Sequence, residues 1–231
     1  MGQHGRMSET THPVPGHVEP GGAALHWQVG PLRIGKVSVS AQDNNAYLLT
    51  HTSGEQLLVD AADSAETLLE VLGGAHPQPH LTTVLTTHGH WDHHRALAAV
   101  VGVTGAEAVA GRDDAGHLPV TLGRALDHGD HLVLGDIQLE VISLRGHTPG
   151  SIALAYHPPD GATWLFTGDS LFPGGVGKTD STGDFTRLLS DVTARVFERF
   201  DDDTVVHPGH GDSTTLGAQR PQLGDWRTRG W

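Results

Sequence analysis

The sequence of 231 residues contains no cysteine. This absence excludes disulfide bonds, thiolate metal sites and a catalytic cysteine, and it leaves the redox compartment open. Any metal ion bound to the chain must be held by nitrogen and oxygen atoms.

Long apolar runs are also absent. No stretch approaches the roughly 18 consecutive apolar residues that a membrane-spanning helix needs, and residues 1–17 lack the apolar core of a secretory signal. We therefore expect a cytoplasmic protein that does not bind membranes.

Basic side chains are scarce: 14 Lys and Arg stand against 27 Asp and Glu, which gives a formal net charge of -13. A surface of this sign repels phosphate backbones and argues against a nucleic-acid partner. The length and the 37% hydrophobic content favour a single core, so we predict one domain over residues 25–231. Residues 1–24 are rich in Gly, Pro, Thr and His and are predicted to form a flexible N-terminal tail.

Short apolar runs alternate with turn signals in two groups. The first group contains LRIGKVSV, AYLLT, QLLVDA, LTTVLTT and EAVAG, with helices predicted for SAETLLEVLGG and for Asp92 to Val101. The second contains HLVLGDIQLEVISL, SIALAYH, ATWLFTG and DTVVHP, with a helix predicted for DFTRLLSDVTARVFERF. Two groups of strands, each accompanied by helices, predict an α/β fold in which two sheets face each other with helices outside.

Histidine is abundant, with 18 residues, and its densest cluster follows the run LTTVLTT. His88 and His90, two residues apart in extended backbone, project to one side, whereas Asp92 and His93 lie where the chain has turned. One such segment can serve two adjacent metal ions. A catalytic site of this type typically uses three protein ligands and a water for each ion, so further ligands must come from elsewhere.

Three more candidates lie just beyond predicted strands: His147, Asp169 and His210. Taken alone, each is more simply a turn residue, a cap or a surface loop residue. Together with the first cluster they form a set of only His and Asp at strand exits, flanked by glycines that allow close backbone approach. The set favours a metal centre. In contrast, His128, His131 and His207 are interpreted as surface groups in turns, and His94 as a structural or solvent-facing group.

The segment THGHWDHH resembles the T-H-x-H-x-D-H signature of the metallo-β-lactamase superfamily, and RGHTPGS, FTGDSLF and PGHG resemble its later motifs in the same order. The likeness runs from about Gly30 to the end of the chain and implies an αββα sandwich, two mixed sheets packed face to face, with metals at the sheet edges. It also implies the ligand sets: one ion held by His88, His90 and His147, a second by Asp92, His93 and His210, and Asp169 bridging them. Zinc is the implied metal, with iron or manganese as alternatives.

Within the superfamily, Asp169 and the turn after His147 resemble the glyoxalase II (hydroxyacylglutathione hydrolase) group. This resemblance implies hydrolysis of a small S-acyl thioester by hydroxide bridging two ions, with Asp92 taking or positioning a proton. Lys178 matches the lysine that contacts the thiol carrier, while residues 179–181 replace a tyrosine of that group. We do not expect the helical C-terminal extension that completes the glutathione site in that group.

Two other functions fit the same motifs. A persulfide dioxygenase-like enzyme would hold one iron through His88, His147 and Asp169. A non-catalytic metal-binding scaffold would keep the ligands without activity.

Overall fold

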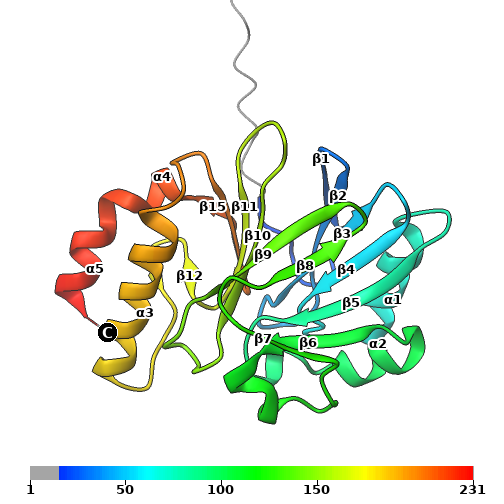
Figure 1. Ribbon diagram of the computed structural model, residues 1–231, viewed down its shortest axis with the longest axis horizontal. Coiled ribbons are helices and arrows are strands. Elements are labelled where there is room, and N and C mark those ends of the chain that lie inside the picture. The colour runs from blue at the N-terminus through cyan, green and yellow to red at the C-terminus, as the bar shows by residue number, and fades with distance from the viewer. Residues whose placement is uncertain (1–15, 231) are drawn as a thin grey trace, which may run out of the picture.

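The computed structural model describes residues 16–230. Two mixed β-sheets pack face to face, and helices cover the outer face of each (Figure 1). The αββα sandwich predicted from the sequence is thereby confirmed.

The first sheet has seven strands in sequential order. They are β1 (Leu25–Val29), β2 (Leu32–Ser38), β3 (Asn45–His51), β4 (Glu55–Val59), β5 (His80–Thr86), β6 (Glu107–Gly111) and β7 (Arg124–Leu126). Strands β1 to β4 are antiparallel, whereas β4 to β7 run parallel. The parallel strands need long connections, which carry α1 (Ala65–Gly74) and α2 (Leu97–Thr104) over the outer face (Figure 1).

The second sheet has six strands. In spatial order they are β15 (Thr214–Thr215), β14 (Val205–Pro208), β11 (Trp164–Gly168), β10 (Ile152–Tyr156), β9 (Ile137–Ser143) and β8 (His131–Leu134). Its outer face carries α3 (Thr182–Val192), which continues as one π-helical turn (Thr193–Phe197), and the short helices α4 (Leu216–Gln219) and α5 (Leu223–Arg229) (Figure 1). A two-stranded ribbon pairs β12 (Leu171–Phe172) with β13 (Gly175–Val176), and single 3-10 segments span Trp91–His93, Arg112–His117 and Arg220–Gln222.

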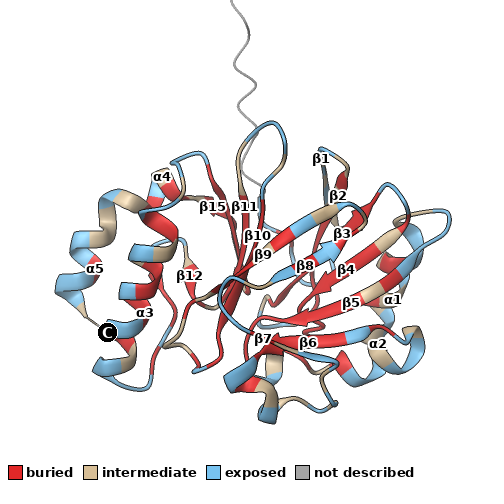
Figure 2. Ribbon diagram, in the orientation of Figure 1, coloured by how far each residue is buried: buried red, intermediate tan, exposed pale blue. Residues whose placement is uncertain are grey.

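The apolar core has three layers, because both faces of each sheet are covered. One cluster, which includes Leu49, Leu57 and Phe166, lies between the sheets. Two others lie between each sheet and its helices. The central strands are consequently buried along their whole length, as Figure 2 shows in red, and their sequences read as apolar runs rather than as strict alternation.

The predicted helix from Asp92 to Val101 is wrong in its first half. Residues 91–93 form one 3-10 turn, and α2 begins only at Leu97. The helical hydrogen bonds are interrupted here for two reasons. His94 has a non-helical φ of -143°, and the Ala96 amide donates to the carbonyl of Ala61 instead of to the preceding turn. This break separates the metal-competent side chains from the helix that follows.

The predicted flexible tail falls largely on residues 1–15, which lie outside the described residues. Residues 16–24 form no helix or strand, but the Gly21 amide donates to the Ser38 carbonyl and Val18 is buried. The flexibility of the tail stays a prediction. In the described part of the chain, no helix is both long and apolar enough to cross a bilayer.

Candidate metal centre

The segment from His88 to His93 leaves strand β5 at the edge where the two sheets approach. His90 has extended backbone, with φ -73° and ψ 135°, and the 3-10 turn begins directly after it. The change of direction explains why His88 and His90 serve one side of the site while Asp92 and His93 serve the other, as the sequence predicts.

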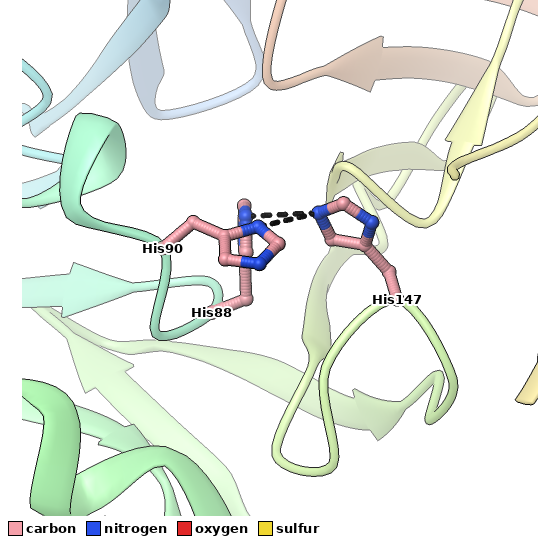
Figure 3. Close-up of side chains that lie close together, drawn as sticks. All are labelled: His88, His90 and His147. Atoms are coloured by element: carbon pink, nitrogen blue, oxygen red, sulfur yellow. Dashed lines mark hydrogen bonds between the residues drawn. The ribbon is translucent and has the colours of Figure 1, made fainter. Parts of the chain in front are cut away.

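Three imidazoles meet on the first side: those of His88, His90 and His147 (Figure 3). His147 comes from the turn between β9 and β10. Its Nε2 atom lies 2.9 Å from Nδ1 of His90 and 3.2 Å from Nε2 of His88. We name these three residues the first trio.

Asp92, His93 and His210 meet on the second side, and we name them the second trio. His210 follows β14, on the other sheet from His93, yet their Nε2 atoms are 3.1 Å apart. An oxygen of Asp92 lies 3.4 Å from Nε2 of His210 and 3.7 Å from Nε2 of His93.

Asp169, directly after β11, lies between the two trios. Its carboxylate oxygens are 3.5 Å from Nε2 of His93, 3.5 Å from Nε2 of His210 and 3.6 Å from Nε2 of His147. The structure thus brings together all seven His and Asp residues singled out in the sequence. Their role as metal ligands stays a prediction.

The environment favours neutral imidazoles and ionised carboxylates at most of these positions. Burial and the neighbouring imidazoles hold the pKa of His88 well below its usual value, and burial also lowers the pKa of His147. Burial opposes ionisation of Asp169, but contacts with His93, His210 and His147 outweigh it and lower the pKa of that carboxyl. Neutral nitrogens and charged oxygens are the forms that bind metal ions.

His93 differs from the other histidines. Burial acts to lower its pKa, yet the nearby Asp169 carboxylate and the hydrogen-bonded Asp60 carboxylate overcome this effect and raise the pKa to about 10. Without a cation, the imidazolium of His93 therefore offsets part of the negative charge of the two carboxylates. A metal ion at Nε2 must displace that proton.

The seven side chains fit a pair of divalent cations. The ligand atoms of each trio all lie within 4.8 Å of one another, and all are nitrogen or oxygen, as a chain without cysteine requires. Oδ1 of Asp169 is buried without a hydrogen-bond partner in the described structure. A carboxylate that lies among three imidazoles and keeps one buried oxygen without a hydrogen bond is the arrangement that a cation would complete.

Residues not singled out in the sequence orient the ligands. Nδ1 of His93 lies 2.9 Å from an oxygen of Asp60, and Nδ1 of His210 lies 2.9 Å from the Gln42 carbonyl oxygen. Asn44 donates from Nδ2 to an oxygen of Asp92 at 3.0 Å. The position of Asp60 at the exit of β4, a parallel neighbour of β5, was the one available sequence signal.

Lys178, the predicted substrate-binding residue, lies beside the first trio. Its carbonyl oxygen is 2.6 Å from Nδ1 of His147, and its side chain is exposed. The backbone of Lys178 therefore orients a candidate ligand, while the ammonium group remains open to solvent at the same edge.

The interpretation of His207 as a surface turn residue is wrong. It lies within β14, is 0% exposed, and stacks on Phe166 with ring centroids 5.2 Å apart. Burial and the nearby Lys36 ammonium lower the pKa of His207 to about 3. The apolar run VVHP continues through this histidine because the strand is buried on both faces.

Comparison with known proteins gives consistent matches. The sequence model of the Metallo-beta-lactamase superfamily matches residues 40–210. A hydroxyacylglutathione hydrolase from Polaromonas sp. is 35% identical over 175 residues, which cover 74% of this chain and 63% of the relative. The chain thus spans less than two thirds of that relative's length.

Two further relatives match over nearly their whole length. The hydroxyacylglutathione hydrolase GloC of Haemophilus influenzae is 28% identical over 82% of this chain and 95% of its own. The crystal structure of TTHA1623 in a di-iron-bound form superposes with a TM-score of 0.68 at 30% identity, covering 80% of this chain and 96% of that one. Both matches extend over about four fifths of this chain.

Proposed function

Since the chain belongs to the metallo-beta-lactamase superfamily, we propose that it is a metal-dependent hydrolase that cleaves a small S-acyl thioester with a hydroxide nucleophile. The observation that carries this proposal is the pair of trios sharing Asp169. The names of the relatives from Polaromonas sp. and Haemophilus influenzae support the thioester, because both are hydroxyacylglutathione hydrolases.

The first cation would be held by His88, His90 and His147, the second by Asp92, His93 and His210, with Asp169 between them. When bound, two such cations supply acidity, since they lower the pKa of water toward about 7 and polarise the carbonyl under attack. Zinc suits a site of this kind, and the di-iron form of TTHA1623 supports iron as an alternative, beside manganese.

Asp92 is the proposed proton acceptor. Burial opposes its ionisation, but the hydrogen bond from Asn44 and the charges of His93 and His210 lower its pKa, so the carboxylate is available at neutral pH. Asn44 Nδ2 also donates to the Asp92 carbonyl at 3.1 Å, which fixes the orientation of the side chain. This arrangement lets an oxygen of Asp92 take or position a proton beside the second trio.

Lys178 is the proposed contact to the thiol carrier. The Lys178 side chain is exposed, whereas its carbonyl oxygen contacts Nδ1 of His147. The side chain therefore starts directly beside the first trio. A carbonyl or carboxylate group of the carrier is the acceptor that a lysine recognises.

A thioester panel tests the proposal. Purified chain is assayed with acyl thioesters, β-lactams, lactones and phosphodiesters, before and after chelation. We expect thioester hydrolysis that chelation abolishes, and no turnover in His90→Ala with the fold largely intact. Near-normal rates in that variant contradict the proposal, and inactivity on the whole panel with metal bound indicates a non-catalytic scaffold.

The persulfide dioxygenase-like alternative uses part of the same site. His147 Nε2 lies 3.2 Å from His88 Nε2 and 3.6 Å from an oxygen of Asp169, so these three groups could hold one iron. The second trio favours two ions instead. Oxygen uptake on glutathione persulfide with one iron per chain would decide for the dioxygenase.

A further inference from the structure

A buried carboxylate connects the two loops that carry the first trio. Asp114 lies in the 3-10 segment after β6, is 0% exposed, and is not one of the seven candidate metal ligands. Its oxygens accept hydrogen bonds from the Gly89 amide at 2.7 Å, from Thr148 Oγ1 at 2.5 Å and from the Gly150 amide at 2.8 Å.

The donors come from both sides of the trio. Gly89 stands between His88 and His90, whereas Thr148 directly follows His147. The same oxygen, Oδ2, accepts from Gly89 and from Thr148. A single atom therefore fixes the separation of two loops that are 57 residues apart, as counted between His90 and His147.

These hydrogen bonds also explain how the Asp114 carboxylate can be buried. Among the described residues no Lys, Arg or His forms a salt bridge with Asp114, so the three hydrogen bonds must offset the cost of removing the carboxylate from water. Removing the carboxylate would release both loops at once.

Glycines allow the close approach on which the contact depends. A Cβ added at Gly150 would lie 2.4 Å from the Asp114 amide nitrogen, and one added at Gly89 would lie 3.2 Å from Asp114 Cγ. Backbone atoms of the two loops therefore lie directly against Asp114, and a shift of one loop moves its histidine.

We propose that Asp114 is a positioning residue that sets the distance between His90 and His147 and thereby the cation affinity of the first trio alone. The second trio has separate partners: Asp60 contacts His93, and the Gln42 carbonyl contacts His210. None of the hydrogen bonds of Asp114 reaches these residues. The inference rests on the proposed function only in requiring that the chain binds two cations.

Zn²⁺ titration of the metal-free protein against a chromophoric chelator tests this role without an activity assay. Wild type should bind two ions. Asp114→Asn should bind one ion with unchanged affinity and the other roughly 10- to 100-fold more weakly, as is typical for residues that orient metal ligands. The control Asp130→Asn removes a similar carboxylate-to-amide bond, to Asp127, away from the site and should leave both affinities unchanged.

Combining Asp114→Asn with a second substitution identifies which of the two sites is weakened. In His210→Ala, which disables the second trio, Asp114→Asn should weaken the remaining ion by the same factor. In His90→Ala, which disables the first trio, it should have no effect. Equal weakening in both backgrounds, or in neither, overturns the proposal.

Thr148→Val provides a milder test if Asp114→Asn fails to fold. It removes only the hydroxyl that donates to Oδ2, and it should weaken the first ion by a smaller factor while the second ion is retained. Unchanged affinity for both ions in this variant overturns the proposal. If wild type binds no Zn²⁺, the proposed function itself fails, and this outcome is distinct from a failure of the Asp114 role.

Discussion

Nδ1 of His93 lies 2.9 Å from an oxygen of Asp60, and their side chains are 0% and 2% exposed. The same carboxylate accepts hydrogen bonds from the amide and the hydroxyl of Thr87. Asp60 therefore connects the second trio to the end of strand β5, and it determines which nitrogen of His93 faces the site.

Asp60→Asn should weaken the second ion roughly 10- to 100-fold, because the charge that orients His93 and raises its basicity is removed. Asp60 has φ 58°, a conformation that asparagine tolerates, so the backbone should be retained. Zn²⁺ titration measures the effect. Asp136→Asn breaks another Asp–His contact of 2.9 Å, to His51, away from the site and serves as the matched control. Equal losses in the two variants would refute a specific role for Asp60.

Metal binding should release a proton from His93. Its pKa is about 10 in the metal-free protein, so affinity of the second trio should rise with pH up to that value, by at most about tenfold per unit. The folding stability of the metal-free protein depends on pH in the opposite direction. The stabilisation that the raised pKa of His93 provides is complete below about pH 6.5 and is lost as pH rises through 10. Calorimetric titration in buffers of different ionisation enthalpy counts the protons. His93→Gln should release about one fewer, and an unchanged count argues against this account.

His207 should make the fold sensitive to acid. Its pKa is about 3 in the folded state and about 6.5 when unfolded, so the unfolded chain takes up a proton first and stability falls as pH drops from 6.5 toward 3. His207→Phe should flatten this dependence by at most about 1.4 kcal/mol per pH unit. Urea unfolding at several pH values between 7.5 and 4 measures the slope. The prediction fails if the variant keeps the wild-type slope.

Lys178→Ala should raise KM for the thioester by roughly tenfold with little change in kcat, because a hydrogen bond from a charged donor is lost while the carbonyl that orients His147 remains. Lys178→Arg retains the charge and should restore part of the affinity. Steady-state kinetics with the preferred substrate of the panel measures both constants. A large fall in kcat at constant KM would place Lys178 in the chemical step instead.

The sequence was most informative where a strand ends in a histidine or aspartate. His88, His147, Asp169 and His210 each follow an apolar run, and because strand ends gather at one edge, their convergence could be predicted without coordinates. The turn after His90 could also be predicted, and it explains why His88 and His90 lie on one side of the site while Asp92 and His93 lie on the other.

The supporting residues could not be predicted. Asp114 and Asn44 look like ordinary loop residues, since their roles depend on contacts with segments about 34 and 48 residues away. The helix predicted from Asp92 failed for a similar reason, because a tertiary hydrogen bond from the Ala96 amide to the Ala61 carbonyl overrides local helix propensity. His207 was misjudged because local sequence does not show that a strand is covered on both faces.

Metal content measured together with thioester hydrolysis tests the central claim most directly. The account predicts two divalent ions per chain, loss of hydrolysis when they are chelated, and recovery when they are restored. A chain that holds a single iron and consumes oxygen, or one that hydrolyses the thioester at an undiminished rate when metal-free, would contradict it.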